Sequence, residues 1–81
     1  DCPDNVKFAV VKKIVEKFRA KQKIIDIDGL RAIYKDGWGL VRASNTQPAL
    51  VLRFEALTEE RLNDIRNEIE SALTTIIKEI Q

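Results

Sequence analysis

The sequence predicts an α+β fold in which a helix, a four-stranded, mainly antiparallel sheet and a second helix form a two-layer sandwich. Apolar residues recur with the helical period near both ends of the chain, and in the middle they alternate with polar residues as in strands. Two Asp-Gly pairs mark tight turns, which favour antiparallel neighbours. Because 81 residues have room for one core, residues 1–81 are expected to form a single domain.

The first helix is predicted from Val11, Ile14, Val15 and Phe18, which lie at i, i+3, i+4 and i+7 and therefore share one face. Phe8 is expected to extend this apolar stripe by one turn. The lysines that lie off the stripe should face solvent, and they are Lys12, Lys13 and Lys17.

The first two strands are predicted on either side of a turn at Asp28-Gly29. Before this turn, Ile25 and Ile27 alternate with aspartates, as in a half-buried strand. Asp36-Gly37 marks the next turn. Between the two turns, one face of the second strand carries Leu30, Ala32 and Tyr34.

The third strand is predicted from Trp38 to Ala43, and the fourth shows the clearest alternation in the chain. The apolar face of the fourth strand consists of Leu50, Leu52, Phe54 and Ala56. Thr58 is a suitable N-cap for the last helix, because its hydroxyl can accept a bond from an otherwise unpaired N–H group. The long apolar stripe of that helix consists of Leu62, Ile65, Ile69, Leu73, Ile76 and Ile80.

The composition excludes several classes of function. No apolar run approaches the ~20 residues of a transmembrane helix, so no membrane partner is expected. With no histidine and a single cysteine, Cys2, the chain lacks the residues for zinc clusters, intrachain disulfides and His-based catalysis. Lys and Arg number 14 against 13 Asp and Glu, and so small an excess argues against nucleic acid as a partner. Because the chain begins at Asp1 and contains no Met, we expect it to be a piece of a longer protein.

One segment is longer than a plain hairpin needs: residues 42–48, with the sequence RASNTQP. Its hydroxyl and amide side chains donate hydrogen bonds, and turn conformations aim successive backbone N–H groups at a common point, which suits an anion. Arg42 adds a planar guanidinium that matches two phosphate oxygens. These features indicate a phosphate cradle. The alternative that remains open is a polar loop in which the side chains at positions 44–46 cap their own turns.

Residues 39–56, GLVRASNTQPALVLRFEA, resemble part of the C-terminal phosphate-binding domain of the alpha-D-phosphohexomutases, of the phosphomannomutase/phosphoglucomutase type. The resemblance covers nearly the whole chain, from the leading helix through the Trp38 strand to the long final helix. It implies that residues 1–81 are the fourth domain of a four-domain parent enzyme, with a fold similar to that of the TATA-binding protein.

The resemblance also implies a function. Members of the family interconvert hexose 1-phosphates and 6-phosphates through a phosphoserine of the first domain and a bisphosphorylated sugar intermediate. A Mg²⁺ ion held by aspartates of the second domain assists the transfer, and the fourth domain binds the phosphate that is not reacting. The implied partners are glucose or mannose 1- and 6-phosphate and the other three domains of a cytoplasmic parent. This chain would then hold no catalytic residue and no metal ligand, and it would be inactive alone.

Four residues match the phosphate-contacting loop of the family: Arg42, Ser44, Asn45 and Thr46. By this resemblance Arg42 would pair with the phosphate dianion, Ser44 and Thr46 would donate their hydroxyls, and Asn45 would donate its amide or backbone N–H. Gln47 departs from the family, which often has Glu there, and this difference changes the local charge. Asn45 resembles the dual-specificity phosphomannomutase/phosphoglucomutase branch, whereas phosphoglucosamine mutases more often have Gly.

Two other functions remain open. The chain could be an independent nucleic-acid-binding module that uses the basic residues 1–23, which carry a net charge of +4, or a structural interaction module. Asp26 and Asp28 share a strand face and would suit a hard cation, but no third oxygen ligand is evident and Asp28 already has a role in the turn. Trp38 and Tyr34 are expected to pack in the sheet or core rather than to stack on a ligand.

Overall fold

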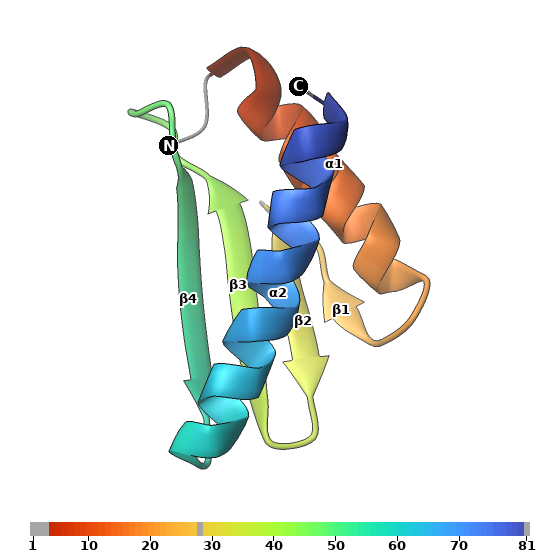
Figure 1. Cartoon of the computed structure of the whole chain (residues 1–81), viewed down its shortest axis with the longest axis vertical. Helices are drawn as coiled ribbons and strands as arrows, with labels where there is room; N and C mark the ends of the chain where they lie inside the picture. The colour runs from red at the N-terminus through yellow and green to blue at the C-terminus, as the bar shows by residue number, and fades with distance from the viewer. Residues whose placement is uncertain (1–3, 28, 81) are drawn as a thin grey trace.

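A computed structural model describes residues 4–27 and 29–80 of the chain. Two helices and a four-stranded antiparallel sheet with the strand order β1-β2-β3-β4 form two layers (Figure 1). The elements are α1 (Asp4–Arg19), β1 (Ile24–Ile25), β2 (Leu30–Tyr34), β3 (Gly37–Ala43), β4 (Leu50–Ala56) and α2 (Glu59–Ile80). The predicted fold class, the order of elements and the antiparallel pairing are confirmed.

The hydrophobic core lies between one face of the sheet and both helices. Buried side chains from α1, β2, β3 and α2 form one cluster, and the inward face of β4 packs against its margin. The buried members are Val10, Ile14, Phe18, Leu30, Ala32, Val41, Ile65, Ile69, Leu73 and Ile76. The helices therefore cover a single face, and the opposite face of the sheet has no covering layer among the described residues.

The buried face of α1 differs from the predicted one. Val10, Ile14 and Phe18 are fully buried, whereas Val11 and Val15 are only half-buried. The prediction that Phe8 extends the core stripe was wrong, because its side chain is 62% exposed. Two apolar stripes overlap on this helix, and periodicity alone does not say which of them meets α2 and the sheet.

The prediction for the first strand was wrong in its extent and its face. β1 contains only two residues, and Ile25 and Ile27 are 44% and 77% exposed. Ile24 pairs with the buried Ala32 and packs against the core instead. Because side chains alternate along a strand, Ile25 then points to the uncovered face. The predicted turn residue Asp28 lies outside the described residues.

The two glycines of the predicted Asp-Gly turns serve different purposes. Gly29 has φ +140°, a conformation that side-chain-bearing residues rarely adopt. Gly37 already pairs with Tyr34, so the turn of this hairpin consists of residues 35–36. A Cβ atom on Gly37 would lie 2.4 Å from the Glu55 carbonyl oxygen and 2.9 Å from Ile65 Cδ1. Gly37 thus allows the close approach of β4 and α2.

The predicted start and apolar stripe of α2 are confirmed. The Arg61 N–H donates to Thr58 Oγ1 at 3.1 Å, which is the bond expected of an N-cap. The next two residues, Glu59 and Glu60, lie in the first turn, where the positive end of the helix dipole stabilises carboxylates. Every position of the predicted stripe is buried or half-buried.

Candidate functional site

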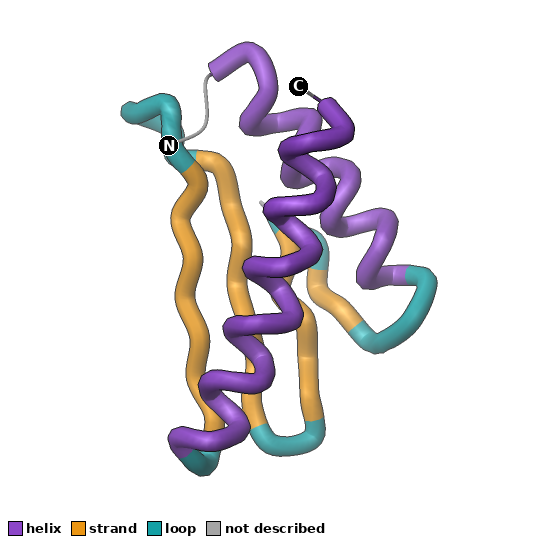
Figure 2. The backbone as a smooth tube through the Cα atoms, in the orientation of Figure 1, coloured by secondary structure: helices purple, strands orange, loops and turns teal. Residues whose placement is uncertain are grey.

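The loop between β3 and β4 lies at the end of the sheet where α1 begins (Figure 2). Its ends are joined by a hydrogen bond of 2.9 Å from the Ser44 N–H to the Ala49 carbonyl oxygen. The Ala49 N–H in turn donates to the Gln47 carbonyl oxygen at 2.8 Å. The segment is therefore a closed turn rather than an extended linker.

The Ser44 hydroxyl organises the tip of this loop. Its oxygen accepts hydrogen bonds from the N–H groups of Thr46 and Gln47, at 3.3 and 3.2 Å. This is the local capping that the alternative interpretation of the loop expects. The hydroxyl acts here only as an acceptor, so its proton remains able to donate to a ligand.

Arg42 lies on the uncovered face of the sheet, next to the loop. Its side chain is exposed, and its cross-strand partner is Val51. Among the described residues, Arg42 forms no ion pair. The guanidinium is therefore not committed to a carboxylate of this part of the chain.

A depression of about 350 Å³ brings Arg42 and Asn45 together. Its other lining residues come from α1 and from the strands: Phe8, Val11, Gly29 and Ala43. Ser44 and Thr46 do not line this depression; Ser44 is half-buried within the loop and Thr46 is exposed at its tip. The exposed Phe8 is thus a wall of the candidate site rather than part of the core.

Lys7 is the functional candidate that the sequence did not reveal. It is only 4% exposed, and its ammonium donates to the carbonyl oxygens of Ser44 and Gln47 at 2.5 and 3.0 Å. The spacing of Lys7 from Val10 and Ile14, at i, i+3 and i+7, places it on the buried stripe of α1. That spacing is the signal by which it could have been found.

Two further arginines share the uncovered face with Arg42. Arg53 follows Val51 by two residues on β4, so it lies diagonally across from Arg42. Arg31 on β2 stacks over the Trp38 ring, 4.8 Å from its centroid. The uncovered face therefore carries three arginines, of which Arg42 is the one next to the loop, and this positive charge favours an anionic ligand.

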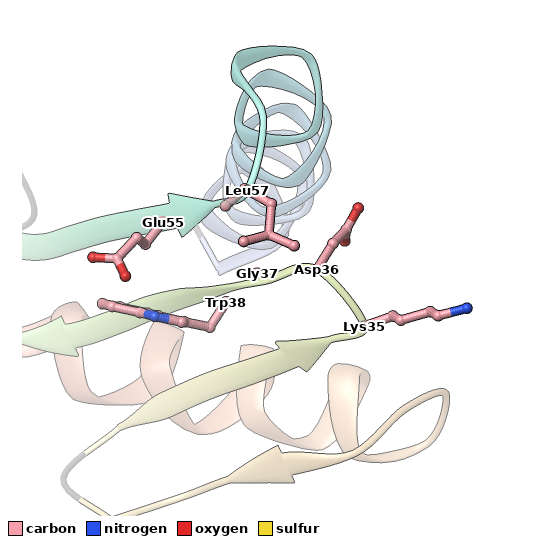
Figure 3. Close-up of a pocket in the computed structure, with 7 residues that line it drawn as sticks. Lys35, Asp36, Gly37, Trp38, Glu55 and Leu57 are labelled. Carbon is pink, nitrogen blue, oxygen red and sulfur yellow. The ribbon is translucent and has the colours of Figure 1, made fainter.

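Another depression, of about 300 Å³, lies at the opposite end of the sheet (Figure 3). Glu55 and Trp38 lie side by side on paired strands there, while the Lys35 side chain points away (Figure 3). Because β3 rises about 3.4 Å per residue, this depression is roughly 20 Å from the loop. It contains none of the predicted phosphate-binding residues.

Tyr34 has a structural environment, as expected. Its hydroxyl donates to Glu68 on α2, and burial together with this hydrogen bond raises the pKa of the phenol.

The described residues contain no group of three or more His, Cys, Asp or Glu side chains that could hold a metal ion. Asp26 forms an ion pair with Arg19 instead, and Asp28 lies outside the described residues. Nor does any helix in the described part of the chain have the length and apolar character needed to cross a membrane.

Comparison with protein families decides what the chain is related to. Residues 2–72 match the family described as phosphoglucomutase/phosphomannomutase, C-terminal domain. The chain belongs to this family. The match includes α1, the whole sheet, the loop and most of α2.

Individual members of the phosphoglucomutase/phosphomannomutase family agree with this assignment. A phosphomannomutase/phosphoglucomutase of Pseudomonas aeruginosa is 43% identical over 74 residues, which is 90% of this chain and 16% of that enzyme. A phosphoglucomutase of Neisseria meningitidis is 51% identical over 57 residues, or 70% of this chain and 12% of that enzyme. The chain therefore spans less than a fifth of the length of these curated relatives.

A solved structure of the same family shows the same fold. The crystal structure of a phosphoglucomutase/phosphomannomutase family protein from Burkholderia thailandensis superimposes with a TM-score of 0.66 at 41% sequence identity. The superposition covers 80% of this chain and 16% of that protein. Most of the fold is thus shared with a family member.

Proposed function

We propose that this chain is the C-terminal, phosphate-binding domain of a longer phosphomannomutase/phosphoglucomutase. The proposed parent interconverts hexose 1-phosphates and 6-phosphates through a phosphoserine and a bisphosphorylated sugar. By the resemblance to the family, the phosphoserine and the ligands of its Mg²⁺ ion would lie in other domains of the parent. The family assignment and the names of the relatives support this proposal.

The observation that carries the proposal is the pairing of Arg42 with Asn45 at one depression beside a closed polar loop. Arg42 would pair with two phosphate oxygens, and the Asn45 side-chain amide or backbone N–H would donate to a third. The hydroxyls of Ser44 and Thr46, which belong to the same loop but do not line the depression, would add donors from the loop tip. Arg53 lies on the same face and would add positive charge.

Binding a phosphate that does not react contributes to catalysis in two ways. The binding energy of this remote group holds the reacting oxygen in line with the phosphoserine. A site that recognises only phosphate also accepts both orientations of the sugar, as the exchange of the 1- and 6-positions requires. Closure of the domain over the substrate would exclude water, which competes for the phosphoryl group.

The test is an NMR titration of the chain with glucose 1-phosphate at low salt, with glucose as the control. We expect backbone amide shifts confined to residues 42–47, with an affinity in roughly the millimolar range for a single phosphate site. Glucose, which lacks the phosphate, should leave these amides unchanged. Shifts that are absent, or that spread over the sheet instead of the loop, would contradict the proposed site.

A further inference from the structure

The contact between α1 and the loop is made by a charged side chain in a buried position. Among the described residues, Lys7 is the one charged side chain that is buried. Lysine is seldom buried, because an ammonium group that leaves water must recover its hydrogen bonds within the protein. Here the carbonyl oxygens of Ser44 and Gln47, at 2.5 and 3.0 Å, provide two of them.

This contact also determines where the loop exposes its donors. The C=O and N–H of a trans peptide point in opposite directions, and the described residues contain no cis peptide. The Ser44 carbonyl points at Lys7, so the N–H of Asn45, which belongs to the same peptide, points away from Lys7. Within the described part of the chain, that N–H makes no hydrogen bond. It is therefore a backbone donor available to a ligand.

We propose that Lys7 is the positioning residue of the phosphate site, an inference that rests on the function proposed above. Its ammonium binds both ends of the turn at residues 44–47 and so fixes the direction of the Asn45 N–H between them. A positive charge on the carbonyl side of a peptide also polarises that peptide, which strengthens its N–H as a donor to an anion. Lys7 thus acts on the ligand through the loop backbone, without touching the ligand itself.

Fold stability alone does not require this ammonium. A methionine has a similar length and would fill the same space without the cost of removing a charge from water. The hydrophobic neighbours of Lys7 on the buried stripe of α1, Val10 and Ile14, already attach the helix to the core. The charge at position 7 therefore points to the loop and its ligand.

The experiment compares Lys7→Met with Lys13→Met in the same NMR titration with glucose 1-phosphate. Lys13 lies on the same helix and is exposed, so its replacement removes the same charge without touching the loop. We expect Lys7→Met to weaken binding about tenfold, the scale of one lost charge-assisted interaction, and to shift the free-state amides of residues 44–47. Lys13→Met should change the affinity by less than about twofold. Equal affinities for the two variants would overturn the role of Lys7 and leave the phosphate site intact.

A second measurement, on the unmodified chain, decides the matter even where Lys7→Met does not fold. The NH₃⁺ signal of a buried, hydrogen-bonded lysine exchanges slowly enough to be followed, and we expect the Lys7 signal to shift in step with the Asn45 amide as glucose 1-phosphate is added. A Lys7 signal that stays fixed while the Asn45 amide shifts would overturn the inference alone. An unmodified chain that does not bind glucose 1-phosphate at all would overturn the proposed function, and the inference with it.

Discussion

Replacement of Arg42 by alanine separates a binding role from a structural one. The side chain is exposed on the uncovered face of the sheet, and among the described residues it has no ion-pair partner. Its removal should therefore change the free energy of unfolding by no more than about 0.5 kcal/mol, as at other surface sites without special contacts. The effect on the ligand should be much larger.

The expected loss of function follows from the chemistry of the guanidinium. A hydrogen bond to a charged group contributes about 1.5–3 kcal/mol, which corresponds to a loss of roughly 10- to 150-fold in the catalytic efficiency of the proposed parent enzyme. Arg42→Lys keeps the charge but loses the planar fork, so its effect should be smaller than that of alanine. The assay is kcat/KM with glucose 1-phosphate, together with the melting temperature of each variant.

The matched control is Arg31→Ala, which removes the same charge from the same face of the sheet. Arg31 lies two strands away from β4 and stacks on Trp38. If the phosphate is bound at the loop, Arg31→Ala should affect kcat/KM far less than Arg42→Ala. Equal losses for both variants would show that a diffuse positive field attracts the substrate, and an unchanged kcat/KM for Arg42→Ala would refute the assignment.

Three further predictions concern the fold. Thr58→Ala should lower the free energy of unfolding by about 1 kcal/mol, because the N-cap hydrogen bond is lost. This loss should lower the melting temperature by roughly 4–8 °C. Val10→Ala should lower the urea midpoint clearly, whereas Phe8→Ala should leave it nearly unchanged, because Val10 is fully buried and Phe8 is 62% exposed; the reverse order would contradict the observed face of α1. Hydrogen bonds, that from Lys21 above all, hold the pKa of Glu68 below its ordinary value of 4.5. Stability from this carboxylate is then present above pH 4.5 and lost as the pH falls through the lowered pKa, so Glu68→Gln should flatten the acid limb of the pH–stability curve.

The sequence predicted best those elements in which the apolar residues follow a single periodic pattern. In α2, six apolar residues recur with the helical period, and the helix begins after a clear N-cap at Thr58. In β4, the alternation continues over seven residues and predicts the inward face correctly. In both elements the local pattern of apolar residues agrees with the tertiary packing, so periodicity alone was sufficient to predict the buried face.

The errors occurred where packing chooses between two local patterns. On α1, the stripes that contain Val10 and Val11 are both apolar, and only contact with α2 and the sheet selects the first. In β1, the partner decides the face: pairing with Ala32 turns Ile24 inward and leaves Ile25 outside. Register across strands is a property of the folded sheet, so it could not be obtained from the alternation within one strand.

The sequence predicts a phosphate site in the loop, which stays a prediction, but it did not reveal the residue that supports this loop. The residue types at Arg42, Ser44, Asn45 and Thr46 already indicate an anion, since each of their side chains can donate hydrogen bonds. The sequence did not distinguish Lys7 from the other lysines of the first helix. Its burial depends on two acceptors, the carbonyl oxygens of Ser44 and Gln47, which lie 37 and 40 residues away in the sequence. Depression-lining residues such as Phe8 were likewise assigned to the core by periodicity.

The two ends of the sheet differ in a way that suits the proposed function. At the end opposite the loop, α2 is tied to the β2–β3 turn by the ion pair between Arg61 and Asp36 at 2.8 Å, and Leu57 N–H donates to the Asp36 carbonyl oxygen at 2.9 Å. At the loop end, Lys7 binds two loop carbonyl oxygens from the helix layer, and Arg42 lines the depression together with Asn45. Two like charges near one loop repel each other, and an anion bound at the depression beside Arg42 would reduce that repulsion. The loop should therefore be more stable with a bound phosphate than without one, whereas the far end should not respond.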